Sequence, residues 1–308
     1  MMYSKNITNK TNWRMYRNGN YDVWINLEDG TKIRENDLDN LTPEFPESID
    51  LNITNKCDIG CPYCYQNCTA DGKHAELKKY TEFINSIRPY TEVAINGNDL
   101  DHPQLIDLLE IFRERNVIAN LTVHKDVFMG RTDLLSMLCE NKLIHGLGVS
   151  FRSMYDPKFN HVRKNIFPNA VIHVVAGLFD EVDYCYLKGT DAKLLILGYK
   201  HVGRGIEYLD FRLDDIEKNW EWLEKKLPFA KNDFSAIGFD TLALEQLHIN
   251  IDVNNEKYFM GDDGDYTFFV DLVSGEYAKN SMTDRRKKIK EGMTVDDMFK
   301  NLDGENDV

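Results

Sequence analysis

The chain lacks a long apolar run, an excess of basic residues and any internal repeat. No segment approaches the length that spans a bilayer, and the first residues lack the apolar core of a signal peptide, so we expect a soluble, cytoplasmic protein with no membrane partner. The 37 Lys and Arg are outnumbered by 51 Asp and Glu, which gives a net charge of -14. Because this acidity repels a phosphate backbone, nucleic acid is disfavoured as a partner.

Cysteine is scarce, but its distribution is uneven. The 308 residues contain six cysteines, and four of them fall within residues 57–68. A chain of this length can bury a substantial core without disulfides, so the clustering indicates a metal site. Cys139 and Cys185 stand alone, and no second cysteine pair completes a zinc site of the usual kind.

From residue 48 onward, short strand-like stretches alternate with longer amphipathic ones. This repetition of β and α units predicts an α/β fold with a parallel sheet and right-handed crossovers. The predicted strands are 48–54, 92–96, 118–124, 145–151, 170–176 and 193–199. The clearest predicted helices are 75–87, 103–115 and 132–141.

One face of the predicted strands is polar. Side chains two residues apart share a face of a strand, and the polar sets are Asp50, Asn52 and Thr54; Glu92 and Asn96; Asn120, Thr122 and His124; and Ser150. A closed eight-stranded barrel fills its interior with apolar side chains, and unpartnered polar groups cost roughly 1–3 kcal/mol each to bury. We therefore favour a partial (β/α)6 TIM-like barrel with a ligand-filled lumen over an open doubly wound sheet. Mutual hydrogen bonding or exposed strands would also explain the pattern.

Extensions flank this predicted core, so we divide the chain into residues 1–47, 48–210 and 211–308. The first part contains an N-terminal β-hairpin over residues 20–36, which turns at Asp29-Gly30. The last part contains a C-terminal helix over 213–226, a strand over 236–239, a β-hairpin that turns at Ser274-Gly275, and a charged tail with an amphipathic piece at 295–302.

Cys57, Cys61 and Cys64 directly follow the first predicted strand of the core, at the end where α/β barrels place their chemistry. Soft thiolates favour iron–sulfur clusters or zinc, and three of them on one short loop leave a cubane with an open iron. Cys68 follows shortly afterwards. As a fourth ligand it would make the chain an iron–sulfur electron-transfer or cluster-binding protein, and this alternative stays open.

The spacing C-x3-C-x2-C, with aromatic Tyr63 before the third cysteine, resembles the motif of the radical S-adenosylmethionine (SAM) superfamily, over residues 48–205. The resemblance is to short members without auxiliary-cluster cysteines. It implies an enzyme whose [4Fe-4S] cluster, on Cys57, Cys61 and Cys64, binds SAM and cleaves it to a 5′-deoxyadenosyl radical. That radical would abstract hydrogen from an unidentified peptide or small-molecule substrate, and a flavodoxin or ferredoxin would supply the electron.

The resemblance also implies SAM contacts at the ends of later strands. The second strand carries a departure from the family's Gly-Gly-Glu-type segment, because only Gly97 is kept. The implied cofactor-binding residues are Tyr63, Asn96, Gly97, Asn98, Asp99, Ser150, Arg152, Val175, Gly177, Leu197 and Gly198.

Four further residues at or near the predicted strand ends are candidate substrate contacts: His124, His173, Lys200 and Arg204. A lone histidine on a strand is more often a structural group than a catalyst, so none of them is assigned a catalytic role.

Overall fold

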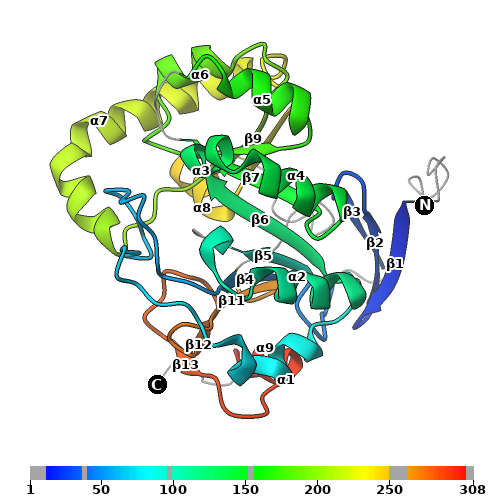
Figure 1. Cartoon of the computed structure of the whole chain (residues 1–308). Helices are drawn as coiled ribbons and strands as arrows, with labels where there is room; N and C mark the ends of the chain where they lie inside the picture. The colour runs from blue at the N-terminus through cyan, green and yellow to red at the C-terminus, as the bar shows by residue number, and fades with distance from the viewer. Residues whose placement is uncertain (1–11, 37–39, 96–98, 152–155, 250–262, 303–308) are drawn as a thin grey trace.

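The computed structural model describes residues 12–36, 40–95, 99–151, 156–249 and 263–302 (Figure 1). It is a mixed α/β structure with a 10-stranded sheet in the order β10-β9-β8-β7-β6-β5-β4-β11-β12-β13, and a separate three-stranded sheet. The α/β class predicted from the repeating pattern is confirmed.

The six predicted core strands are all present and pair in parallel with their neighbours in chain order. They are β4 (Ser48–Asn52), β5 (Glu92–Ile95), β6 (Ile118–His124), β7 (Gly146–Ser150), β8 (Val171–Val175) and β9 (Lys193–Leu197). Two strands from the C-terminal part lengthen this parallel run: β10 (Ala236–Phe239) lies beside β9, and β11 (Thr267–Asp271) lies beside β4. β12 (Glu276–Ala278) and β13 (Lys287–Lys288) follow in antiparallel pairing.

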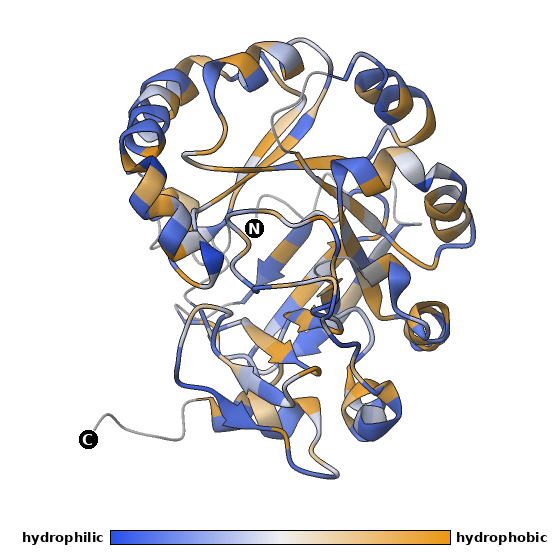
Figure 2. Cartoon of the chain, turned by 60° about the vertical axis from the view of Figure 1, so that its left-hand side comes forward, coloured by the Kyte–Doolittle hydropathy of each residue, from blue (hydrophilic) through white to orange (hydrophobic). Residues whose placement is uncertain are grey.

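The helices lie outside the strands, as Figure 2 shows. They are α1 (Thr81–Ser86), α2 (Leu105–Glu114), α3 (Lys125–Gly130), α4 (Thr132–Glu140), α5 (Phe159–Ile166), α6 (Glu181–Leu187), α7 (Arg204–Lys226), α8 (Thr241–Gln246) and α9 (Val295–Asn301), with short 3-10 turns η2 (Leu77–Tyr80), η3 (Asp99–Asp101) and η4 (Leu227–Phe229). The helix predicted over 213–226 begins earlier, at Arg204, and is kinked at Arg212.

The main hydrophobic core lies between the helices and one face of the sheet. Alternate strand residues such as Leu51, Val93 and Val149 are fully buried there with the apolar stripe of α2. Each such side chain contributes roughly 1.5–3 kcal/mol by leaving water. The opposite face is only half-buried at Asn120 and along the rest of the inward positions of β6. The predicted division into an apolar and a polar face is therefore confirmed along this strand.

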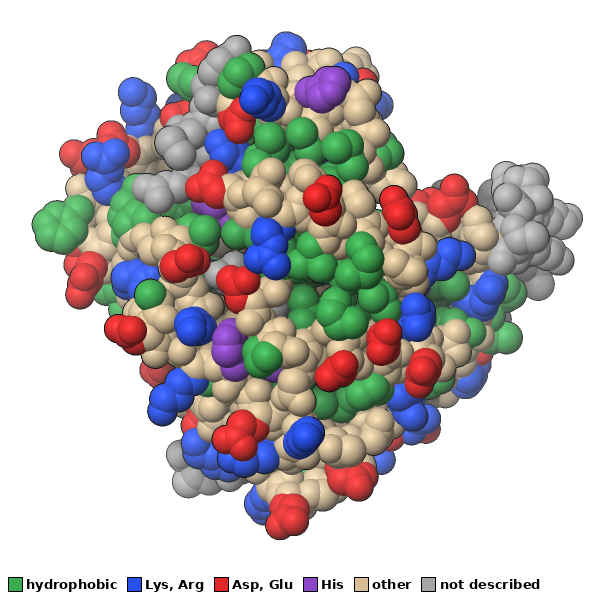
Figure 3. Space-filling view, in the orientation of Figure 1, with side chains coloured by type: hydrophobic (Ala, Val, Ile, Leu, Met, Phe, Trp, Pro, Cys, Tyr) green, Lys and Arg blue, Asp and Glu red, His purple; other side chains and the backbone are tan. Residues whose placement is uncertain are grey.

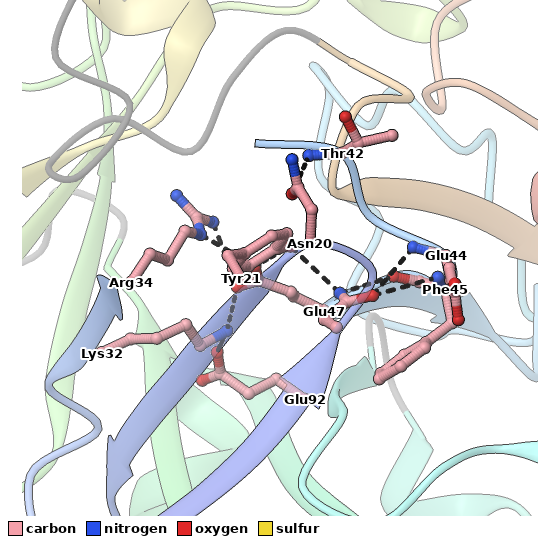
Figure 4. Close-up of polar contacts among 10 residues, drawn as sticks. Asn20, Tyr21, Lys32, Arg34, Thr42, Glu44, Phe45, Glu47 and Glu92 are labelled. Atoms are coloured by element: carbon pink, nitrogen blue, oxygen red, sulfur yellow. Dashed lines mark hydrogen bonds and ion pairs between the residues drawn. The ribbon is translucent and has the colours of Figure 1, made fainter. Parts of the chain in front are cut away.

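The N-terminal sheet comprises β1 (Trp13–Asn18), β2 (Tyr21–Asn26) and β3 (Lys32–Glu35). The predicted hairpin corresponds to β2 and β3, and β1 adds a third antiparallel strand that the pattern did not predict. A network of buried charges around Glu47 joins this sheet to the amino ends of β4 and β5 (Figure 4). Glu92, predicted to face the lumen with Asn96, instead pairs with Lys32 at 2.7 Å.

No helix in the described part of the chain is both long enough and apolar enough to cross a bilayer. The face drawn in Figure 3 carries acidic and basic side chains scattered among apolar ones.

Candidate functional site

The three motif cysteines lie on the loop that follows β4, at the carboxyl end of the parallel strands. All three are free thiols and half-exposed. Short backbone ladders shape the loop: the amide of Cys57 donates to the carbonyl of Thr69 at 2.8 Å, and the amide of Thr69 donates to Asn55 at 3.1 Å. The loop is therefore held at its base, and the thiols lie on its accessible part.

Hydrogen-bond donors surround two of the motif sulfurs. A hydrogen bond with the Cys68 side chain, the amides of Gln66 and Cys68 and the charge of Arg204 together outweigh burial and lower the pKa of Cys64 to about 6. Burial raises the pKa of Cys57, although the amides of Ile59 and Gly60 partly offset it. Because the thiolate is the metal-binding form, the loop favours the ligating state of Cys64.

Arg204 hydrogen-bonds to the cysteine loop through both its side chain and its backbone. Its guanidinium donates to the carbonyls of Cys61 at 3.1 Å and Cys68 at 3.0 Å, and its amide donates to the carbonyl of Cys64 at 3.1 Å. The preceding Gly203 has φ of 59°, and a Cβ there would lie 2.4 Å from the carbonyl oxygen of Tyr65. The guanidinium that we predicted to contact substrate is thus bonded to the loop.

The donor set consists of three thiols on one short loop, the ligand type of iron–sulfur clusters. Within the described ranges, no three Cys, His, Asp or Glu side chains converge closely enough to hold one metal ion. A [4Fe-4S] cluster binds its thiolates through separate irons, so its ligands need not converge on one point. Amide N–H groups aimed at Cys57 and Cys64 are the kind of contact that tunes such a cluster. The three cysteines therefore fit this group.

Three predicted residues form a row across neighbouring strands. His124 pairs with Ser150, and Ser150 pairs with His173; the first two end β6 and β7, and His173 is the middle residue of β8. Nδ1 of His124 accepts a hydrogen bond from the amide of Asp126 at 3.2 Å, so this histidine caps α3. Burial lowers the pKa of His173 to about 4, and its ring is neutral at physiological pH.

Val175 and Leu197 also lie side by side, on β8 and β9. The two predicted glycines next to them let helices approach the sheet closely. A Cβ on Gly177 would lie 2.6 Å from Ile216 of α7, and one on Gly198 would lie 2.3 Å from Leu242 of α8. Their small size is explained by packing.

The remaining predicted SAM contacts are only partly covered by the structure. Asn96, Gly97, Asn98 and Arg152 lie outside the described residues, and only the backbone of Asp99 is described, at the start of η3. The ring of Tyr63 packs edge-on against Tyr208 of α7, with 5.7 Å between the ring centroids.

Lys200 lies in a polar cluster that the sequence did not reveal. Its ammonium donates to Ser281 Oγ at 2.9 Å and lies 4.2 Å from the ring centroid of Tyr65. Asp50, on β4, is close enough to Lys200 for the ammonium to offset part of the rise in the pKa of this carboxyl. Asp240, the N-cap of α8, accepts from the amide of Gly198 at 2.8 Å. Asp50 was visible in the strand alternation, whereas its partners depend on distant segments.

A search against protein-family models and a search of curated proteins each found no match to this chain. Any assignment of function therefore depends on the motif and on the geometry around it.

Proposed function

We propose that this chain is a radical SAM enzyme whose [4Fe-4S] cluster is held by Cys57, Cys61 and Cys64. The observation that carries the proposal is the position of these three free thiols, on one loop at the carboxyl end of a parallel sheet. When bound, the cluster supplies the electron that cleaves SAM to a 5′-deoxyadenosyl radical, which then takes hydrogen from a peptide or small metabolite.

The chain's own residues prepare the loop for this role. Arg204 and the backbone ladders hold the loop in one shape, and the amides near Cys57 and Cys64 donate to the sulfurs. Such N–H···S contacts favour the thiolate form and tune the reduction potential. A flavodoxin or ferredoxin remains the proposed reductant, and the cytoplasm the proposed location.

We further propose that the parallel strands form a partial (β/α)6 TIM-like barrel with SAM across its mouth. Helices cover one face of the strands, and Asn120 and Ser150 are half-exposed on the other. In this arrangement SAM would contact Ser150, Val175 and Leu197, which lie on the neighbouring strands β7, β8 and β9. The neutral ring of His173, paired with Ser150, would add a polar contact.

Cys68 supports a second candidate function, a four-cysteine electron-transfer protein. Its side chain is 5% exposed and its thiol faces Cys64, so it lies near enough to the triad to be considered as a ligand. Replacing Cys68 with Ser separates the two candidates. The radical SAM proposal expects the variant to keep a cluster that responds to SAM, whereas a four-cysteine carrier would lose its cluster.

The direct test is anaerobic reconstitution with iron and sulfide, reduction with dithionite, addition of SAM and quantification of 5′-deoxyadenosine. We expect product from the wild type and from Cys139→Ser, which alters a cysteine on α4 away from the loop. We expect none from Cys61→Ser. A fully loaded wild-type cluster that yields no 5′-deoxyadenosine would refute the enzymatic proposal.

A further inference from the structure

A polar cavity of about 240 Å³ lies between the cysteine loop, the carboxyl ends of β4 and β11, and residues 281–286. This volume is below the range of drug-sized sites and suits a small ligand. Phe269 and Met282 contribute apolar surface to its wall, and Asn52, Asn55 and Gln66 contribute amides. None of our predicted site residues lines it.

The three amides each present an unused hydrogen-bonding atom. Oδ1 of Asn52, Oδ1 of Asn55 and Nε2 of Gln66 are buried and have no hydrogen-bond partner. Asn52 is only 3% exposed. Buried polar atoms are normally paired, so three unpaired atoms that line one cavity indicate that something else completes them.

In Asn52 and Gln66, the second polar atom of the amide has a partner, and this fixes which atom is unused. Nδ2 of Asn52 donates to Asp271 Oδ1 at 3.0 Å, so Oδ1 of Asn52 is the atom left over. The side-chain oxygen of Gln66 accepts from the thiol of Cys68 at 3.7 Å, which leaves its Nε2 unused. The cavity therefore offers two acceptors and one donor.

Two charged groups of the wall, Asp271 and Arg286, are bonded to neighbouring side chains or to the backbone. Asp271 accepts from Asn52, from the amide of Val273 at 2.9 Å and from Ser274 Oγ at 2.9 Å. Arg286 donates to the carbonyl of Ser281 at 2.9 Å and lies 3.9 Å from Asp271. Asp284 lines the cavity too, and its side chain is on the exposed surface. The buried, unused groups are therefore neutral.

We propose that this cavity binds a primary carboxamide, such as the end of an asparagine or glutamine side chain or of a small amide metabolite. A carboxamide has two N–H donors and one carbonyl acceptor, which complements the two asparagine oxygens and the Gln66 amide. A carboxylate lacks the donors, and an amidinium lacks the acceptor.

Combined with the proposed function, on which this extension rests, the cavity identifies the substrate class as an amide-bearing molecule. Gln66 connects the two sites, because its side chain lines the cavity and its backbone amide donates to Cys64. Binding itself does not require the cluster, so it is measured separately from SAM cleavage.

The experiment uses the full-length protein without cluster and three probes of equal size: propionamide, propionate and propionamidine. Saturation-transfer NMR measures the binding of each. We expect propionamide to bind at least about tenfold more tightly than propionate, the equivalent of one hydrogen bond. Met282→Trp, which fills the cavity, should abolish the propionamide signal. Equal affinities for propionamide and propionate would overturn the proposal. Propionamide binding that is unaffected by Met282→Trp would also overturn it, because the probe would then bind outside the cavity.

A specificity switch provides the second readout. Gln66→Glu replaces the buried Nε2 donor of the cavity with an acceptor at nearly constant shape, so it should weaken propionamide binding about tenfold and make propionamidine the preferred probe. Gln104→Glu makes the same chemical change at the start of α2, away from the cavity, and should leave all three affinities unchanged. An unaltered probe preference in Gln66→Glu would contradict the proposal. If propionamide binds but no 5′-deoxyadenosine forms, the cavity proposal stands and the radical SAM proposal is wrong.

Discussion

The Glu47 carboxylate at the amino ends of the parallel strands and the amides at their carboxyl ends differ in how fully they are paired. At the amino ends, Glu47 is 0% exposed and each of its oxygens is paired: Tyr21 donates at 2.6 Å, and Arg34 donates to both oxygens at 2.8 and 3.1 Å. At the carboxyl ends, thiols are half-exposed and the amides of Asn52, Asn55 and Gln66 keep unpartnered atoms. A buried carboxylate whose oxygens are both paired holds a structure together, whereas an unpaired amide atom in a cavity is available to a ligand.

Assembling the network at the amino ends costs desolvation free energy, so removing one of its partners should lower the stability of the fold. Removing Glu47, Lys32 and Arg34 from water carries a desolvation penalty that only close pairing offsets. Lys32 extends the network to Glu92, and the ring of Tyr266 lies 4.2 Å from the Arg34 guanidinium. We infer that this end supplies stability, so changes there should affect folding rather than ligand chemistry.

The largest expected effect is on the cluster, at the carboxyl end. Cys64→Ser should reduce bound iron after reconstitution to background, because serine replaces the thiolate that the loop favours. The unfolding free energy of the cluster-free protein should change by less than about 1 kcal/mol, since the residue is half-exposed. Iron analysis and urea denaturation measure the two quantities. A cluster retained at wild-type occupancy would mean that Cys64 is not a ligand.

The next largest effect is on stability, at the amino end. Glu47→Gln should lower the unfolding free energy by about 3–5 kcal/mol, because it leaves Arg34 buried without its counter-charge and Lys32 with Glu92 alone. Urea denaturation measures this loss. The control is Glu44→Gln, an exposed position that should stay within about 0.5 kcal/mol of the wild type. If the two variants were equally stable, the proposed difference between the ends would be wrong.

A smaller loss of stability is expected on the inner face of the sheet. A Cβ on Gly148 would lie 2.5 Å from the His173 ring and 2.7 Å from Thr122 Oγ1. Gly148→Ala should therefore cost about 1–3 kcal/mol through overpacking. Gly130, at the end of α3, has nothing near its Cβ position, and Gly130→Ala should be neutral or stabilising by up to about 1 kcal/mol. Thermal unfolding of both variants checks the contrast.

At neutral pH the smallest effect is expected from His173, whose shifted pKa makes the stability depend on pH only in acid. Its folded-state pKa of about 4 lies below the unfolded value of about 6.5, because burial disfavours the charged ring. The unfolded chain therefore takes up a proton first as pH falls, and the stability that His173 contributes is lost between about pH 6.5 and 4. His173→Gln should flatten this part of the stability profile, measured by urea denaturation at several pH values. Parallel profiles for the two proteins would show that His173 is not shielded.

Local patterns predicted much of the fold. β6 and β10 have the bounds expected from their apolar alternation, and the hairpin of β11 and β12 turns at Ser274-Gly275 as predicted. The cysteine loop also lies where the βα repeat placed it, after β4. These features depend on side chains close together in the sequence, whose periodicity is independent of the rest of the chain.

Contacts between distant segments decided the rest. Asn52 bonds to Asp271, 219 residues away, and Glu92 bonds to Lys32 of the N-terminal sheet. Arg204 was predicted to face substrate, yet the packing of α7 against the loop directs it to backbone carbonyls. The sequence by itself determined the six core strands, the two faces of β6 and the cysteine triad, because these depend on neighbouring residues. Only the tertiary structure decided which polar groups are paired and which remain open to a ligand, because a partner depends on which remote segment packs alongside.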